Sequence, residues 1–230
     1  MRVTIHRPLF AWECLEDSPS LRTVQAFLET VPDGRLLESL RSARGRGRND
    51  YPVSALWGTV LLQTVLRHPT MEGCLGELRR NAALRRLIGI ESEDAVPNPW
   101  NVSRFLEVLG HEPHRSLLSA LFEEMIGRLV AVVPDLGRAV AGDATGLRAR
   151  RTRSDAGEAG DLPMATGGRK EYTDDDGKVV KVVAWFGYKL HLIVDVHHEV
   201  VLAWRISSAN AADNTELPED YEALRKILPA

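Results

Sequence analysis

The stretch VVKVVAWFGYKLHLIVDV, residues 179–196, is the part of the sequence that decides the fold. It is rich in β-branched and aromatic residues, which pack well on a pleated surface, and it predicts one long strand or two strands joined at Gly187. Residues 197–199 follow as a turn, and VVLAWRISSA, residues 200–209, has a similar composition. The two segments therefore predict an antiparallel hairpin.

A further strand is expected before this hairpin. AVAGDATGL, residues 139–147, is a short apolar segment, and Asp143 is expected at the end of that strand, where its side chain points into a site. Residues 148–178 are polar and rich in glycine and charge, which predicts a loop. Asn210 and Asp213 suit a tight loop and a helix N-cap, and the end of the chain, EDYEALRKIL, predicts a helix.

The chain before residue 135 has helical spacing of its apolar residues. The helix expected from Pro52 to Val65 is apolar nearly all round, so it should lie in the centre of a core. Pro97 and Pro99 predict that residues 89–101 form a loop. Helices followed by strands predict an α+β chain with a helical domain over 1–135 and a second domain over 136–230.

Composition and charge place limits on the partners. The chain has 230 residues and a net charge of −3, and it contains neither an export signal nor an apolar run long enough to span a bilayer, so we expect a cytoplasmic protein without membrane contact. Cys14 and Cys74 are expected to be free thiols. Arginines cluster locally and could neutralise the phosphates of a nucleic acid. The alternative is that these clusters only form solvated helix faces and loops. The candidates for DNA contact are Arg79, Arg80, Arg85, Arg86, Arg148, Arg150 and Arg151.

Asp143 is the main candidate for chemistry. It stands in Ala-Gly-Asp-Ala-Thr at the end of an apolar strand, where a carboxylate costs desolvation energy unless a partner compensates it. A divalent metal ion is one such partner, because Mg²⁺ is typically held by one or two carboxylates plus substrate phosphates. The alternative is a structural aspartate that caps a turn with Thr145. The local residues leave the two readings open.

A second candidate group lies on the long strand. Strand alternation puts Lys189, His191, Ile193 and Asp195 on one face of residues 186–195. Lys189 and His191 could contact phosphate there, with Asp195 orienting either one. The alternative is an ordinary strand with one solvated face.

These pieces, taken in order, carry a resemblance. Gly-Asp-Ala-Thr, then Gly-Tyr-Lys-Leu-His-Leu-Ile-Val-Asp, then Ala-Asn-Ala-Ala-Asp resembles the start of the catalytic domain of insertion-sequence transposases of the Asp-Asp-Glu type. The preceding stretch YPVSALWGTVLLQTVLRHPTMEGCLGELRRNAALRRLIGI and the stretch VPNPWNVSRFLEVLG are similar to the helical N-terminal domain of one branch of that family. The resemblance covers roughly residues 45–215.

The resemblance implies a ribonuclease H-like fold that begins with three antiparallel strands and a first helix. In that family three carboxylates bind two Mg²⁺ ions that cut and join DNA strands. Asp143 matches the first carboxylate, and Lys189 and His191 match a strand beside the site, which implies at most a supporting role. The implied partner is the DNA of transposon ends, with a homodimer as one oligomeric option.

The second and third carboxylates have no counterpart among these residues. We therefore expect a transposase-derived, truncated chain that is catalytically inactive, with its third strand left as an open edge. Two alternatives stay open. One is a stand-alone DNA-binding module, in which residues 82–109 form a helix–loop–helix. The other is a remnant without function.

Overall fold

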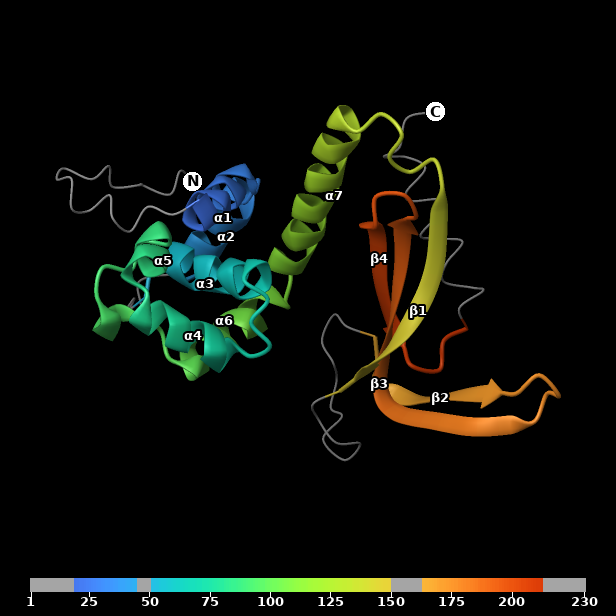
Figure 1. Ribbon diagram of the computed structural model, residues 1–230. Helices are drawn as coiled ribbons and strands as arrows, with labels where there is room; N and C mark the ends of the chain where they lie inside the picture. The colour runs from blue at the N-terminus through green and yellow to red at the C-terminus, as the bar shows by residue number, and fades with distance from the viewer. Residues whose placement is uncertain (1–18, 45–50, 150–162, 213–230) are drawn as a thin grey trace. The chain divides into compact units, whose positions relative to one another are not determined.

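The computed structural model describes residues 19–44, 51–149 and 163–212 (Figure 1). Helices come first along the chain and strands follow, as the sequence predicted. The chain forms two compact units, residues 1–122 and 123–230, which divide within the last described helix. The seven described α-helices and one 3-10 turn are α1 (Pro19–Thr30), α2 (Gly34–Arg44), α3 (Val53–Val65), α4 (Met71–Arg80), α5 (Ala82–Leu87), η2 (Glu93–Ala95), α6 (Pro99–Leu109) and α7 (His114–Val132).

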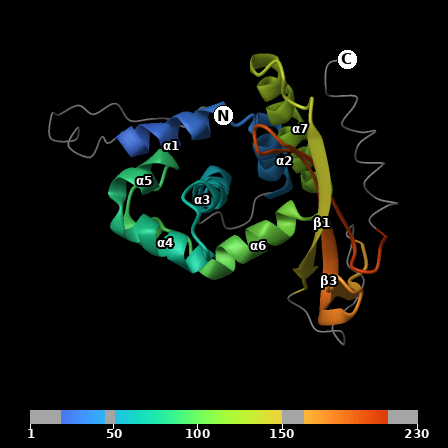
Figure 2. The same ribbon diagram turned by 45° about the vertical axis from the view of Figure 1, so that its right-hand side comes forward.

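Helix α3 is the centre of the helical unit, as its uniformly apolar sequence predicted. Figure 2 looks nearly along α3 and shows it among α1, α4, α5 and α6. Gly58 allows a close approach, because an added Cβ there would lie 2.5 Å from Cγ2 of Ile88. A buried side-chain hydrogen bond joins α3 to the residue before α2: Trp57 Nε1 donates to the carboxylate of Asp33 at 2.9 Å. Burial raises the pKa of Asp33, and the hydrogen bond from Trp57 partly offsets that rise.

Side-chain caps set where three of these helices begin. Thr70 and Asn81 accept hydrogen bonds from the backbone N–H groups of the third residues of α4 and α5. Asn98 does the same for α6, accepting from the backbone N–H of Asn101 at 2.9 Å. Helix α6 therefore starts at Pro99, and the predicted loop over 89–101 is too long. A proline is well tolerated in the first turn of a helix, where its missing N–H has no intrahelical partner.

The second unit carries one antiparallel sheet of four described strands: β1 (Val140–Arg148), β2 (Thr166–Thr173), β3 (Val179–Asp195) and β4 (Val200–Ser208). Strand β3 is central. Its second half pairs with β1 and β4, and its first half pairs with β2. The end of β4 meets the start of β2, because Ser208 Oγ donates to the carbonyl of Met164 at 2.7 Å and Asn210 N donates to Thr166 Oγ1 at 3.1 Å. Gly187 lies inside the single long strand β3.

Two details of the predicted strands are wrong. The predicted loop over 148–178 contains β2, so the sheet has four strands where three were expected. Gly167 and Gly168 lower the strand propensity of this segment. Gly168 is required there, since an added Cβ would lie 2.6 Å from the Trp185 ring. Strand β1 also continues to Arg148, so Asp143 lies inside the strand rather than at its end.

The expected fold class is confirmed. Strands β1, β3 and β4 follow one another as the antiparallel strands with which a ribonuclease H-like domain begins, after an all-helical part. The predicted cap at Asp213 and the predicted final helix lie outside the described residues. Cys74 is a buried free thiol, and burial raises its pKa to about 11; Cys14 lies outside the described residues. None of the described helices is long and apolar enough to cross a bilayer.

Candidate functional site

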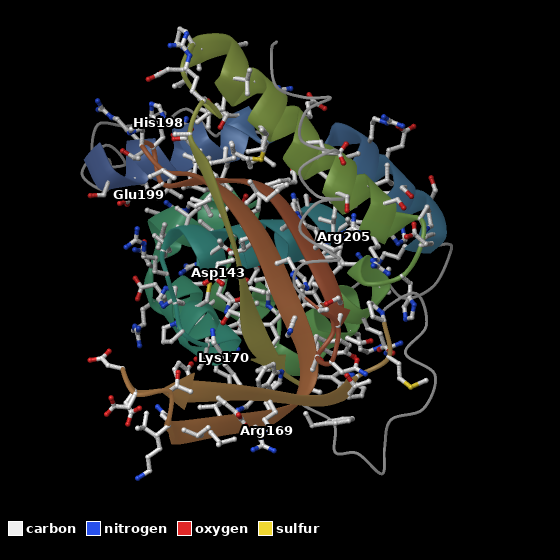
Figure 3. The ribbon with its side chains drawn as sticks, turned by 90° about the vertical axis from the view of Figure 1, so that its right-hand side faces the viewer. Asp143, Arg169, Lys170, His198, Glu199 and Arg205 are labelled. Atoms are coloured by element: carbon white, nitrogen blue, oxygen red, sulfur yellow. The ribbon has the colours of Figure 1, made fainter. Side chains whose placement is uncertain are left out.

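Asp143 lies in the middle of β1, directly opposite Leu192 of β3, which in turn pairs with Trp204 of β4. Residues paired across antiparallel strands project from the same face, so these three side chains share one face of the sheet. That face is open: Asp143 is exposed, Leu192 is half-buried, and Trp204 is 38% exposed. Figure 3 shows the Asp143 side chain on β1. An accessible carboxylate thus stands beside apolar side chains that remain partly uncovered.

The Asp143 carboxylate has one oxygen engaged within the strand. Its Oδ1 accepts a 2.7 Å hydrogen bond from the backbone N–H of Ala144. The structural alternative, a turn capped jointly with Thr145, does not occur, because both residues lie in a regular strand. The second oxygen is available to a hard cation, which prefers carboxylate ligands. Within residues 19–44, 51–149 and 163–212, no three His, Cys, Asp or Glu side chains gather as a metal site.

The face that carries Lys189 and His191 is buried, which contradicts the alternative of a solvated strand face. His191 and Asp195 are both fully buried, at 0% exposure. The ring of His191 shares a 2.7 Å hydrogen bond with Ser207 Oγ. Lys189 donates through Nζ to the carbonyl of Ala211 at 2.7 Å. Both side chains are therefore engaged within the fold, on the opposite side of the sheet from Asp143.

Asp195 has a structural partner set that the sequence did not reveal. Its carboxylate accepts from the backbone N–H of Gly137 at 2.7 Å, and from the backbone N–H groups of His197 and His198 at 3.0 and 2.7 Å. It also accepts from the ring of His198 at 2.8 Å. Burial would raise the pKa of Asp195, but these hydrogen bonds outweigh it and lower the pKa to about 2. Asp195 therefore ties the start of β1 to the β3–β4 turn, and it orients neither Lys189 nor His191.

The four arginines of the α4–α5 region divide into two pairs. Arg79 and Arg85 are half-buried. The Arg79 side chain donates to the carbonyl of Pro97 at 3.5 Å, and the Arg85 side chain donates to the carbonyl of Arg79 at 3.1 Å. Arg80 and Arg86 are exposed, and Arg80 forms a 3.1 Å ion pair with Glu77. Hydrogen bonds from Arg80 and Asn81 lower the pKa of Glu77. Only Arg80 and Arg86 therefore present their charge on the surface.

Of the candidate arginines at 148–151, only Arg148 lies within the described residues. Arg148 is exposed at the end of β1, opposite Gly187. Arg150 and Arg151 lie outside the described residues.

Sequence reasoning missed a group of side chains on β2 and the first half of β3. Lys170, Tyr172 and Lys181 lie together there. Lys170 and Tyr172 fall in the predicted loop over 148–178, whereas Lys181 falls in the predicted strand over 179–196. A signal was present, because Asp-Gly at 176–177 is a common hairpin turn and β-type residues stand on both sides of it.

Comparison with known protein families matches both halves of the chain. Residues 12–107 match the family described as "Transposase domain (DUF772)". Residues 135–229 match the family described as "Transposase DDE domain". No curated protein and no solved structure gave a significant match. The two matches follow the order of the helical unit and of the sheet that carries Asp143, and on that ground the chain belongs to the DDE transposases of insertion sequences.

Proposed function

We propose that this chain acts on the DNA ends of an insertion sequence and that Asp143 supplies one carboxylate of a divalent-metal centre, with Mg²⁺ as the ion. The observation that carries the proposal is the setting of Asp143. Its carboxylate is exposed inside a β-strand, one oxygen is held by Ala144 N, and nothing in the strand itself requires the charge. A metal ion bound there would activate the attacking hydroxyl or stabilise the leaving oxygen of a phosphodiester.

The open surroundings of Asp143 support this role. One edge of β1 pairs with β3, and its other edge pairs with no described strand. A further strand can add to that edge and bring a second carboxylate close to Asp143. The half-exposed Leu192 and the exposed Trp204 offer apolar surface for elements that would cover this face. We place Lys189 and His191 in supporting positions, holding the sheet from its other face.

We also propose that the 230-residue polypeptide binds DNA without cutting it. Two metal ions need several carboxylates, and Asp143 alone does not hold them. Cutting would need further carboxylate ligands from outside the described residues or from another chain, including a second copy in a homodimer. Within this proposal the protein works in the cytoplasm, where the buried free thiol of Cys74 is stable.

A second candidate function is a stand-alone DNA-binding module. The helical unit has a continuous core of its own, which favours independent folding. The exposed Arg80 and Arg86 would contact phosphates. The segment between α5 and α6 is longer than the three- or four-residue turn of a helix-turn-helix, so another docking geometry is expected.

A gel shift and a nicking assay with terminal inverted-repeat DNA test the proposal together. The proposal expects salt-dependent binding by the whole chain and no Mg²⁺- or Mn²⁺-dependent nicking by either the wild type or Asp143→Asn. If the 1–122 fragment binds as tightly as the whole chain, the stand-alone module is favoured. Absence of binding at low salt would reject both candidates, and nicking abolished by Asp143→Asn would reject the inactivity while supporting the role of Asp143.

A further inference from the structure

The hairpin formed by β2 and the first half of β3 projects from the rest of the sheet as a two-stranded ribbon. Residues 166–173 pair with 179–187, and the tight turn at 174–178 closes the ribbon. Figure 1 shows β3 bending where it meets β2, so that the ribbon leaves the part of the sheet formed with β1 and β4. Isolated two-stranded ribbons are marginally stable in water. This one leaves apolar side chains on its surface: Tyr172 is 44% exposed, Val180 62% and Val182 45%.

Close contacts at Gly187 and Trp185 fix the bend in β3 from which the ribbon projects. Gly187 has φ +151°, and an added Cβ would lie far inside van der Waals contact with the carbonyl of Leu147. The Trp185 ring fills the inside of the bend, since added Cβ atoms would lie 2.7 Å from it at Gly146 and 2.6 Å from it at Gly168. Trp185 Nε1 also donates a 3.0 Å hydrogen bond to the carbonyl of Tyr188. The ribbon is thus held at a fixed angle to β1, the strand of Asp143.

One face of the ribbon carries unbalanced positive charge around an aromatic ring. Tyr172 is paired with Lys181 across the ribbon, and Lys170 is two residues before Tyr172, so strand alternation puts all three on one face. Both lysine Nζ atoms lie 5.7 Å from the centre of the Tyr172 ring. Neither lysine forms an ion pair with a described residue. We call Lys170, Tyr172 and Lys181 the ribbon cluster.

The opposite face of the ribbon is balanced in charge, and the turn of the ribbon is acidic. On the opposite face, Arg169 and Glu171 form an ion pair with each other; Figure 3 labels Arg169 and Lys170 on β2. At the turn, the carboxylate of Asp174 accepts from the backbone N–H groups of Asp176 and Lys178 at 3.2 and 2.8 Å. The acidic turn repels phosphates, so an anionic partner would meet the flank of the ribbon and not its tip.

We infer that the ribbon cluster is a docking surface for duplex DNA, with Lys170 and Lys181 on backbone phosphates and Tyr172 against sugar or base edges. A two-stranded ribbon fits the major groove of B-DNA, and exposed lysines beside an aromatic ring suit a polyanion that also offers flat apolar surface. This inference rests on the proposed function, because the DNA that the ribbon cluster would bind is the DNA on which the chain is proposed to act.

The test compares two double variants of the whole chain that alter opposite faces of the ribbon. Lys170→Gln/Lys181→Gln removes the charge of the ribbon cluster. Arg169→Gln/Glu171→Gln removes one charge of each sign from the other face and keeps the net charge. Affinity for duplex terminal inverted-repeat DNA is measured by fluorescence anisotropy between about 50 and 300 mM salt. Thermal unfolding checks that both variants fold.

The lysine variant is expected to lose about eightfold in affinity per lysine at about 0.1 M salt, and its salt slope should fall by about 2, because each phosphate contact contributes about 0.9 to that slope. The Arg169/Glu171 variant should bind like the wild type. Tyr172→Ala should weaken binding at every salt concentration and leave the slope unchanged.

Three results would overturn the inference. If the wild type binds DNA and the lysine variant binds equally well with the same slope, the ribbon inference fails while the proposed function stands. If the wild type binds no DNA at low salt, both fail together. If the lysine variant changes the oligomeric state in sedimentation and leaves DNA affinity unchanged, the ribbon docks on a second copy of the chain and the inference is wrong.

Discussion

The carboxylate of Asp195 accepts a 2.7 Å hydrogen bond from the backbone N–H of Gly137, a residue 58 positions earlier in the chain. Asp195 closes β3, and Gly137 leads the chain into β1. This contact ties down the start of the strand that carries Asp143. The candidate site therefore depends on a carboxylate that takes no part in its chemistry.

The first prediction concerns the pH dependence that Asp195 gives to stability. Its pKa is about 2 in the folded chain and about 3.8 in its ordinary state. A carboxyl group with a lowered pKa stabilises the fold above the ordinary value, and that contribution is lost as the pH falls from about 4 to about 2. Asp195→Asn should therefore be less stable than the wild type at pH 7, and the gap should close toward pH 2.5. Urea unfolding at both pH values measures this, and an equal gap at pH 7 and pH 2.5 would contradict it.

A second prediction concerns the buried pair of Asp33 and Trp57. Trp57→Phe removes the indole N–H that donates to the buried Asp33 carboxylate, which should cost about 1–3 kcal/mol of unfolding free energy beyond the loss of ring volume. Asp33→Asn serves as the partner variant in a double-mutant cycle. The two changes should be clearly non-additive in urea unfolding, and additivity within ~0.3 kcal/mol would show that the hydrogen bond contributes nothing.

The third prediction separates the two pairs of arginines in the α4–α5 region. Arg79→Gln/Arg85→Gln should lower the melting temperature of the helical unit, because both side chains hold backbone carbonyls. Arg80→Gln/Arg86→Gln should leave that temperature nearly unchanged and should weaken DNA binding, with a salt slope lower by up to about 2. Equal DNA affinity of the second variant and the wild type would remove these arginines from the interface.

A fourth prediction compares two glycines of the sheet unit. Gly187→Ala should destabilise the chain by more than ~1 kcal/mol, since its Cβ would meet the backbone of β1 and its positive φ is unfavourable for alanine. Gly127→Ala is the matched control, because an added Cβ at this position in α7 has nothing within 4 Å. That control should gain about 0.5–1 kcal/mol from the higher helix propensity of alanine. Thermal unfolding of both variants checks the contrast, and a neutral Gly187→Ala would mean that the bend does not require glycine.

Much of the fold could be predicted from the sequence, because its main strands and helices follow simple periodicities. Strands β1, β3 and β4 were expected from apolar and β-branched runs, and α3 from its uniformly apolar sequence. Strand β2 was missed in spite of the Asp-Gly turn signal at 176–177, since its glycines lower strand propensity, and Gly168 is needed because the Trp185 ring lies against it. The sequence does not reveal that contact.

The candidate site was predictable only in part. The placement of Asp143 on a strand followed from the apolar segment around it and from the resemblance, whereas its place inside that strand did not. Which face of β3 is buried could not be predicted, because polar residues ordinarily mark a solvated face. Here His191 and Asp195 are buried, with partners at Ser207 and Gly137 that are distant in sequence. Contacts of this kind are set by tertiary structure.

The most direct test of the account is whether Asp143 binds a divalent metal ion. Mn²⁺ is titrated into the isotopically labelled 230-residue chain in the presence of inverted-repeat DNA, and paramagnetic broadening of backbone NMR signals is measured. If Asp143 is a metal ligand, broadening is strongest at Asp143 and its cross-strand neighbour Leu192 and is lost in Asp143→Asn, while the signals of the acidic turn at 174–176 change equally in both proteins. Broadening at Leu192 that persists in Asp143→Asn, or that never appears in the wild type, would contradict the assignment of Asp143 as a metal ligand.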